Sequence, residues 1–240
     1  MKKILALNLK MNFNYQDVID YVEELSGEIN SKNVILFPPT IFLPYFISNE
    51  YALGSQNISE FDNGAHTGEI SCTQLKSIGG TYVLLGHSER RKDQKEKDTE
   101  LNLRIKKALS SGLKVIYCVG ETKEEREMLK TTKIIKSELL NGLNDISPDD
   151  LRNIIIAYEP IWSIGTGVIP TVKDITSTTN FIIDTCVNAF NYKPRVLYGG
   201  SVNEKNIEEL NKIDVVSGFL VGGASLDVKK VLKMKEVIEK

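Results

Sequence analysis

Residues 154–167 read IIIAYEPIWSIGTG, and this stretch decides the fold of the chain. An apolar run leads into one carboxylate, Glu159, which is followed by a Pro-Ile-Trp segment and a glycine-flanked loop. A short and nearly continuous apolar run is typical of a parallel strand that is buried on both faces. The stretch therefore predicts a strand that delivers Glu159 to its carboxyl end, beneath a lid that the freedom of Gly165 and Gly167 makes mobile.

Similar apolar runs recur along the whole chain and alternate with amphipathic stretches. This alternation predicts repeated βαβ units, and therefore a parallel sheet. The predicted strands are Ile4–Leu7, Val34–Phe37, Ala52–Ser55, Tyr82–Gly86, Val115–Cys118, Ile154–Ala157, Val196–Tyr198 and Gly218–Val221. The predicted helices are Asp17–Ile29, Leu101–Leu109, Glu124–Leu143, Ile175–Phe190 and Val228–Ile238, and a capping Ser147 before Pro148 marks the start of one more.

Eight such units close a barrel or form an open doubly wound sheet, and the position of the polar residues separates the two. Polar residues follow the first, fourth, sixth, seventh and eighth strands, always at the carboxyl end. An open sheet concentrates such residues at one switch point, whereas a barrel gathers all eight strand ends around one mouth. Because no linker or low-complexity run divides the chain, we expect residues 1–240 to form a single (β/α)8 barrel domain.

The composition excludes several classes of function. The net charge of −2 and the pI near 5.9 are unlike those of a nucleic-acid-binding protein. No apolar run approaches the length of a membrane span, and the amino terminus lacks the cleavage site of a signal peptide. The three cysteines, Cys72, Cys118 and Cys186, are too few and too scattered for a disulfide framework or a zinc site. We expect a soluble, cytoplasmic protein without nucleic-acid or membrane partners.

Three strand ends carry residues suited to proton transfer. Glu159 follows the sixth strand, His87 lies at the turn after the fourth, and Lys10 follows the first. A helix amino terminus repels positive charge, so His87 is expected to stay neutral and to donate a hydrogen bond to a carbonyl group. Asn8 and Lys10 are expected on one side of their strand, because side chains alternate with a period of two. A buried lysine needs a partner, and Lys10 therefore indicates an anionic ligand.

Glycine pairs follow the seventh and eighth predicted strands, at Gly199-Gly200 and Gly222-Gly223. Glycines let backbone N–H groups approach a phosphate, and these two loops are the usual phosphate seat of such barrels. The sequence therefore predicts a phosphorylated substrate. No metal-ligand spacing or dinucleotide fingerprint is present, so we expect a site that works without metal or cofactor. Cys118 has no base beside it in the sequence, and we expect it to pack beneath Glu159.

Taken together, nine motifs in this order resemble those of the triosephosphate isomerase family, and the resemblance covers nearly the whole chain. It implies a TIM barrel, the (β/α)8 fold of that family. The motifs are Asn8–Asn12 (NLKMN), Gln56–Asn57, Thr67–Ser71 (TGEIS), Gly86–Arg91 (GHSERR), Cys118–Glu121 (CVGE), Tyr158–Trp162 (YEPIW), Gly165–Gly167, Tyr198–Ser201 (YGGS) and Gly218–Leu226 (GFLVGGASL).

The resemblance implies an isomerase of glycolysis and gluconeogenesis that interconverts dihydroxyacetone phosphate and D-glyceraldehyde 3-phosphate through an enediol(ate). A glutamate base with a neutral histidine is the established pattern of this family. By that pattern Glu159 moves the proton between C1 and C2, and His87 polarises the carbonyl group. Lys10 stabilises the developing negative charge with support from Glu89, and Asn8 orients the carbonyl oxygen.

The resemblance also implies the phosphate site and the assembly. Backbone amides of Gly165, Ser201, Gly222 and Gly223 would bind the phosphate. The loop around Thr67 would interlock two copies in a homodimer, and His66 beside it would add a pH-sensitive contact.

Local departures from the family pattern concern the lid and the region near the dimer interface. Leu9 stands where the family usually has Trp, and Ser163 replaces a common Ala. The segment Val168–Pro170 replaces a Lys-containing hinge, and this difference bears on the rate at which the lid opens and closes. Gln94-Lys95 replaces an aromatic-Gly pair near the dimer interface.

Two other readings fit parts of the sequence. Other phosphate-binding barrels, such as sugar-phosphate epimerases or indole-pathway enzymes, share the loops after strands seven and eight but lack the combined motifs. A non-catalytic protein that keeps the scaffold is the second reading. Loss of Lys10, His87 or Glu159 would favour it, and all three are present.

Overall fold

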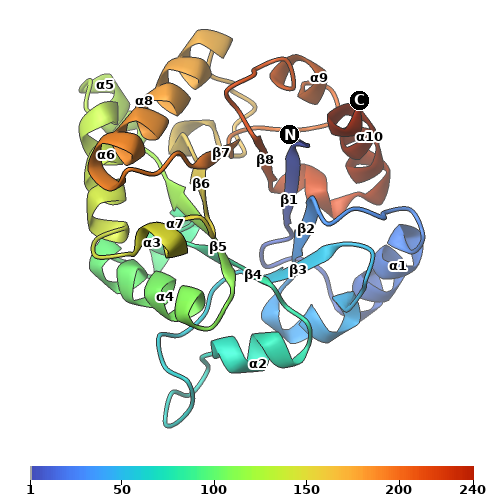
Figure 1. Ribbon diagram of the computed structural model, residues 1–240. Coiled ribbons are helices and arrows are strands. Elements are labelled where there is room, and N and C mark those ends of the chain that lie inside the picture. The colour runs from blue at the N-terminus through green and yellow to red at the C-terminus, as the bar shows by residue number, and fades with distance from the viewer. Residues whose placement is uncertain (1) are drawn as a thin grey trace.

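A computed structural model describes residues 2–240, so residue 1 of the predicted domain lies outside the described residues. Eight parallel strands form a closed barrel in which each strand pairs with its neighbours in chain order (Figure 1). All eight predicted strands are confirmed, with ends that shift by at most one residue. The strands are β1 Ile4–Asn8, β2 Val34–Phe37, β3 Ala52–Ser55, β4 Tyr82–Leu85, β5 Lys114–Val119, β6 Ile154–Tyr158, β7 Arg195–Tyr198 and β8 Gly218–Val221.

Helices surround the barrel on its outer side, as Figure 1 shows. The α-helices are α1 Tyr15–Leu25, α2 Cys72–Ser77, α3 Ser88–Asp93, α4 Asp98–Ser110, α5 Lys123–Glu127, α6 Thr131–Gly142, α7 Pro148–Leu151, α8 Val172–Phe190, α9 Ile207–Leu210 and α10 Val228–Glu239. Three 3₁₀ helices lie in the connections, η1 Thr40–Phe46, η2 Ile161–Ser163 and η3 Gly223–Leu226. The predicted cap is present, because Asp150 N donates to Ser147 Oγ at 3.1 Å.

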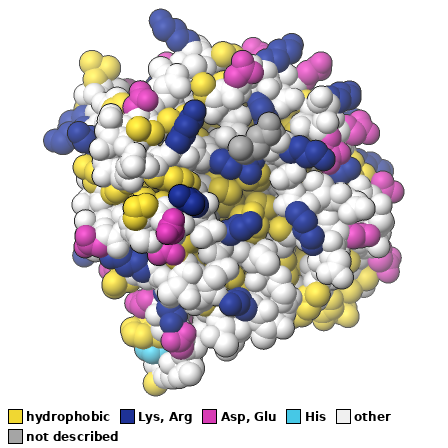
Figure 2. Space-filling view, viewed as in Figure 1, with side chains coloured by type: hydrophobic (Ala, Val, Ile, Leu, Met, Phe, Trp, Pro, Cys, Tyr) yellow, Lys and Arg dark blue, Asp and Glu magenta, His cyan; other side chains and the backbone are white. Residues whose placement is uncertain are grey.

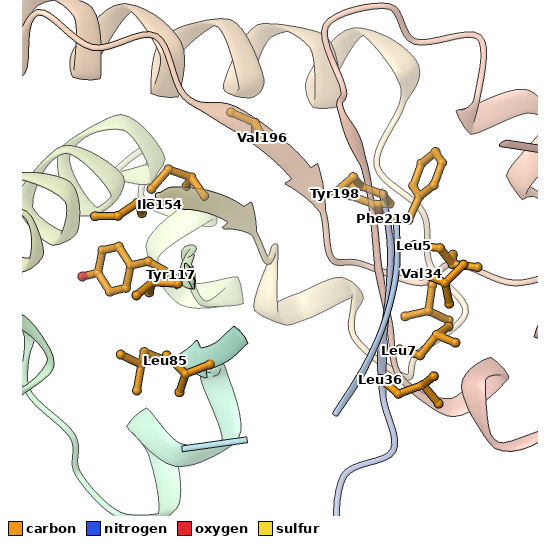
Figure 3. Close-up of a cluster of buried hydrophobic side chains, with 14 of the residues drawn as sticks. Leu5, Leu7, Val34, Leu36, Leu85, Tyr117, Ile154, Val196, Tyr198 and Phe219 are labelled. Carbon is orange, nitrogen blue, oxygen red and sulfur yellow. The ribbon is translucent and has the colours of Figure 1, made fainter. Parts of the chain in front are cut away.

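The period of two divides each strand between two cores. Ile4 and Ala6 of β1 belong to a cluster of buried side chains inside the barrel. Leu5 and Leu7 belong to a larger cluster between the barrel and the helices. Figure 3 shows part of this outer cluster, where Tyr117 of β5 points away from the barrel toward the surrounding helices. Both faces of the strands are therefore buried, which explains their continuous apolar runs.

One predicted helix is interrupted in the structure. The stretch Glu124–Leu143 was expected to be a single helix, but it divides into α5 and α6. Leu129, between them, has a left-handed backbone with φ of 57°, and its side chain is 90 % exposed. A leucine gives no sequence signal for this conformation, which glycine or asparagine usually adopts.

Gly218 allows the barrel to close between β8 and β1. It pairs with Ile4, and its φ is 150°. A Cβ atom at this position would lie 2.1 Å from the carbonyl oxygen of Ile4. Because backbone cannot move aside as a flexible side chain can, only glycine fits this closing pair.

The amino-terminal ends of the strands close the end of the barrel opposite the predicted site. Lys114 Nζ, at the start of β5, lies 5.5 Å from the ring centroid of Tyr82 at the start of β4. Arg195, at the start of β7, donates to the carbonyl of Lys2. Basic side chains accordingly group near the middle of the face on which the N-terminus lies (Figure 2).

A partly buried network around Arg91 ties the ends of β4 and β5 to the helices. Its guanidinium donates to the carbonyl of Gly86 at 2.8 Å, and it lies 2.7 Å from Asp98 and 3.5 Å from Glu138. Glu138 in turn accepts a hydrogen bond of 2.8 Å from the backbone N–H of Gly120. Burial raises the pKa of Glu138 to about 8, although Arg91 and the Gly120 N–H act in the opposite direction.

Glu138 should make the stability of the protein depend on pH. Its folded pKa of about 8 lies above the ordinary value of 4.5, so the folded state binds the extra proton between these two values. Glu138 therefore stabilises the folded state fully below about pH 4.5, and this contribution to the free energy of unfolding decreases as the pH rises toward 8. In Glu138→Gln the amide cannot ionise, and its oxygen can still accept from Gly120.

The measurement is urea unfolding of both proteins in steps between about pH 5 and pH 8. We expect the variant to gain stability relative to the wild type as the pH rises. Glu127→Gln, at an exposed position on α5, is the matched control and should show a constant difference. A constant difference for Glu138→Gln as well would contradict this role of the carboxyl group.

Candidate active site

Glu159 occupies the position that the sequence predicts, directly after β6. Its backbone N–H donates to the carbonyl of Val119 at 2.8 Å, which continues the pairing of β5 with β6 by one residue. The residue is 2 % exposed. One carboxylate oxygen lies 3.2 Å from Nε2 of His87, and the other accepts from the backbone N–H of Ser88 at 3.2 Å. A buried carboxylate is thus held against an imidazole.

His87 caps the short helix α3. The N–H of Glu89 donates to its Nδ1 at 3.3 Å, so Nδ1 acts as an acceptor and carries no proton. The remaining ring proton then lies on Nε2, which faces Glu159. This arrangement gives a structural reason for the neutral imidazole that we expected at a helix amino terminus.

Asn8 and Lys10 both line the cavity. The prediction that Lys10 lies on the same strand as Asn8 is wrong. We expected the two residues on one side of a single strand. β1 ends at Asn8, and Lys10 has a left-handed backbone with φ of 52°. Two side chains hold this backbone, since Lys10 N donates to Asn8 Oδ1 at 3.0 Å and Gln56 Nε2 donates to the Lys10 carbonyl at 2.8 Å. A strained non-glycine residue held in this way is typical of functional sites.

The side chain of Lys10 is paired with Glu89. The distance from Nζ to Oε1 is 2.5 Å, and the Glu89 side chain is half exposed. Glu89 does not line the cavity itself and reaches it through Lys10 and His87. The supporting role that the sequence predicts for Glu89 stays a prediction.

The predicted phosphate-binding residues border the same cavity, which has a volume of about 200 Å³. They lie in the lid and in the loops that follow β7 and β8. Together with the acid–base residues, the lining includes Asn8, Lys10, His87, Glu159, Gly165, Ser201, Gly222 and Gly223. The strand ends that are separate in the sequence therefore meet at one mouth, as a barrel requires.

Two glycines set the position of Glu159, and sequence reasoning missed this role. A Cβ atom on Gly120 would lie 1.8 Å from the carbonyl oxygen of Glu159, and one on Gly199 would lie 2.9 Å from its Cγ. Gly120 follows β5 and Gly199 follows β7, so the backbones of both strands next to β6 lie close against Glu159. A glycine directly after a strand was the available signal.

Cys118 lies inside the barrel, as expected, and is 1 % exposed. Burial raises the pKa of its thiol well above the usual range, and the nearby charge of Glu159 adds to the effect. The thiol therefore stays protonated and is a packing group rather than a nucleophile.

The lid is anchored by a group whose role sequence reasoning also missed. Glu121 is fully buried, and it accepts hydrogen bonds from Trp162 Nε1 at 3.0 Å and from the Tyr158 hydroxyl at 3.3 Å. The guanidinium of Arg126 lies 4.5 Å from the Trp162 ring and 3.5 Å from Glu121. Beyond this anchor, Gly165 and Gly167 adopt the positive φ angles that we expected of a hinged loop.

Within residues 2–240, no group of three or more His, Cys, Asp or Glu side chains is placed to hold a metal ion. None of the helices in that part of the chain is long and apolar enough to cross a membrane.

The closed barrel and the carboxylate, imidazole and amine at its mouth define a (β/α)8-barrel enzyme of the acid–base kind. A family model described as triosephosphate isomerase matches residues 3–238, and the chain belongs to that family. It is 39 % identical to the triosephosphate isomerase of Thermodesulfovibrio yellowstonii, over 97 % of this chain and 98 % of the relative. It is 40 % identical to that of Alkaliphilus metalliredigens, over 94 % and 95 %, and 36 % identical to that of Lawsonia intracellularis, over 98 % and 97 %.

The close approach at Gly120 yields a prediction about stability. Gly120→Ala places a methyl group against backbone, which cannot yield as a side chain can, so we expect a loss of about 3 kcal/mol or more in the free energy of unfolding. Gly79→Ala is the matched control, because Gly79 has a positive φ but open space around its Cα. It should lose only about 1–2 kcal/mol from the left-handed backbone. Urea unfolding measures both, and equal losses would show that the contact with Glu159 is unimportant.

Proposed function

We propose that this chain interconverts dihydroxyacetone phosphate and D-glyceraldehyde 3-phosphate at the mouth of the barrel, through an enediol(ate) intermediate. The observation that carries the proposal is the buried Glu159 carboxylate, which lies 3.2 Å from Nε2 of a neutral His87 inside a cavity lined by Lys10. Membership in the triosephosphate isomerase family supports the choice of substrate.

The geometry supports a separate role for each of these residues. Glu159 takes the proton from one substrate carbon and returns it to the next, because its buried carboxylate lies directly against the cavity. The Nε2–H of His87 donates to the substrate oxygen on which charge develops. Lys10 places a cation beside the same charge, Glu89 fixes the amine, and Asn8 orients the carbonyl oxygen.

The phosphate group is held by backbone amides of Gly165, Ser201, Gly222 and Gly223, which border the cavity on the lid side and after β7 and β8. All the chemistry is proton transfer and electrostatics, so in this proposal the site uses neither metal nor cofactor. We further propose that residues 1–240 form one domain and that the protein acts in the cytoplasm, as expected for an enzyme of glycolysis.

Glu159→Gln tests the reaction and its base together. The amide keeps the shape of the side chain but cannot accept the carbon-bound proton, so turnover of glyceraldehyde 3-phosphate should fall by about 10²–10⁴-fold. The assay uses purified protein without added metal or cofactor. Glu124→Gln, at an exposed position near the start of α5, is the matched control and should keep full activity.

Binding of inorganic phosphate to the Glu159→Gln variant should persist, since the phosphate amides are unchanged. Near-normal turnover in this variant would overturn the assigned base. A folded wild type that binds phosphate but shows no turnover would indicate a scaffold kept for binding.

We also propose a homodimer formed through the loop around Thr67. The connection from β3 to α2, cyan to teal in Figure 1, projects away from the barrel. Large apolar side chains remain exposed on this loop and on the neighbouring connections, with Met11 95 %, Ile41 77 % and Phe61 47 % exposed. Exposed apolar side chains on adjacent loops favour a protein partner, and a second copy is the partner that the family implies.

His66 lies on this loop, and its ring stacks on Phe61 with centroids 3.9 Å apart and planes at 4°, so a partner that packs on the loop would cover the imidazole. Sedimentation equilibrium over a range of protein concentrations measures the dissociation constant of the dimer. A protein that stays monomeric at every concentration would contradict the proposed homodimer.

A further inference from the structure

The side chain of Glu138 holds the end of β5 from outside the barrel. Glu138 belongs to α6, and one of its carboxylate oxygens accepts a hydrogen bond of 2.8 Å from the backbone N–H of Gly120. Gly120 is buried and is the first residue after β5. A buried backbone N–H needs an acceptor, and Glu138 supplies it. The lining of the cavity does not include Glu138, so any effect on the reaction passes through Gly120.

Tyr117 fixes the helix that carries Glu138. It points from β5 toward the surrounding helices (Figure 3), and its hydroxyl donates to the backbone carbonyl of Glu138 at 2.9 Å. One turn further along α6, a Cβ atom on Gly142 would lie 2.2 Å from the same hydroxyl oxygen. The backbone of Glu138 and its carboxylate are thus both bonded to the carboxyl-terminal part of β5 and the residue after it. The carboxylate therefore has a fixed position relative to this strand.

A displacement of Gly120 would be passed on to Glu159. The two backbones are in direct contact, because a Cβ atom on Gly120 would lie 1.8 Å from the Glu159 carbonyl oxygen. The N–H of Glu159 is also bonded to the residue before Gly120, since it donates to the carbonyl of Val119 at 2.8 Å. Protein interiors are packed as densely as organic crystals and transmit such shifts. The hydrogen bond from Gly120 to Glu138 is therefore linked to the position of Glu159.

The other half of the network contacts the backbone beside the histidine of the site. Arg91 donates to the carbonyl of Gly86, directly before His87, at 2.8 Å. Its guanidinium lies 3.5 Å from the Glu138 carboxylate. Arg91 thus holds the backbone next to the imidazole, and Glu138 holds the backbone next to the carboxylate. One pair of side chains outside the cavity fixes both strand ends on which the acid–base residues depend.

We propose that Glu138 is a positioning residue that fixes Gly120 and, through it, the general base Glu159; this inference rests on the proposed function. The role requires an acceptor for the Gly120 N–H and does not require a negative charge. Glu159 lies 3.2 Å from Nε2 of His87, and proton transfer depends on this placement. A displacement of about 1 Å that starts far from the reacting atoms can lower the rate by about 10²-fold.

The phosphate site lies apart from this contact. The glycines and the serine proposed for it belong to the lid and to the loops after β7 and β8, and Gly120 is not among the residues that line the cavity. Loss of the hydrogen bond at Gly120 should therefore lower kcat and leave KM and phosphate binding unchanged. A role in general stability alone would not separate these quantities.

Turnover of glyceraldehyde 3-phosphate by Glu138→Met and Glu138→Gln tests this role. Methionine has nearly the shape of glutamate but only a weakly accepting thioether, whereas glutamine accepts through its amide oxygen. In Glu138→Met, kcat should fall by about ten- to hundredfold, and KM should stay within about twofold of the wild type. Glu138→Gln should restore kcat to within about threefold of the wild type. Inorganic phosphate should inhibit all three proteins at the same concentration.

Lys136→Met, at an exposed position on the same helix, is the matched control and should keep the kcat of the wild type. Urea unfolding establishes that each assayed protein is folded. Should Glu138→Met not fold, Glu138→Asp takes its place, because its carboxylate is one methylene group further from Gly120. It should show the same loss of kcat at unchanged KM.

Three results would overturn the role of Glu138. The first is a folded Glu138→Met with the kcat of the wild type. The second is an equal loss in Glu138→Met and Glu138→Gln, because the charge beside Arg91 would then matter and not the acceptor. The third is a rise in KM or a loss of phosphate inhibition in parallel with kcat. Absence of turnover in the wild type would instead overturn the proposed function, and this inference with it.

Discussion

The structure depends on the close approach of two backbones where the barrel closes. At Gly218 the chain passes so near to Ile4 that no side chain fits, and this contact brings β8 beside β1. Without it, the strands would form an open sheet with two edges. Closure also sets the site, because it places the loop after β8 against the loop after β1. A Cβ on Gly222 would lie 3.0 Å from Cε of Lys10.

From this closure, the site is built by backbone contacts rather than by its own side chains. Gly120 and Gly199 press on Glu159 from both sides, and the helix that His87 caps fixes the orientation of the imidazole. Lys10, by contrast, is held mainly by its ion pair with Glu89. The acid–base pair is therefore held by the most rigid part of the molecule, whereas the lid above it rests on a few side-chain hydrogen bonds.

Much of this arrangement could be predicted from the sequence, because the barrel places chemistry directly after strands. Glu159 and His87 each follow an apolar run, and a run buried on both faces is easy to find. The left-handed residues were not predictable, since neither Lys10 nor Leu129 is a residue type that favours that conformation. Gln56 and Glu121 were assigned no role, because their partners lie far away in the chain and only the fold brings them together.

The left-handed backbone at Lys10 places two demands on one residue. The main chain at this position would suit glycine, which adopts a positive φ at no steric cost. The cavity needs an amine that reaches Glu89, which only a long basic side chain supplies. Glycine at position 10 would therefore raise the stability of the fold but remove the amine from the site. Selection for stability alone would lower the activity of the enzyme at this position.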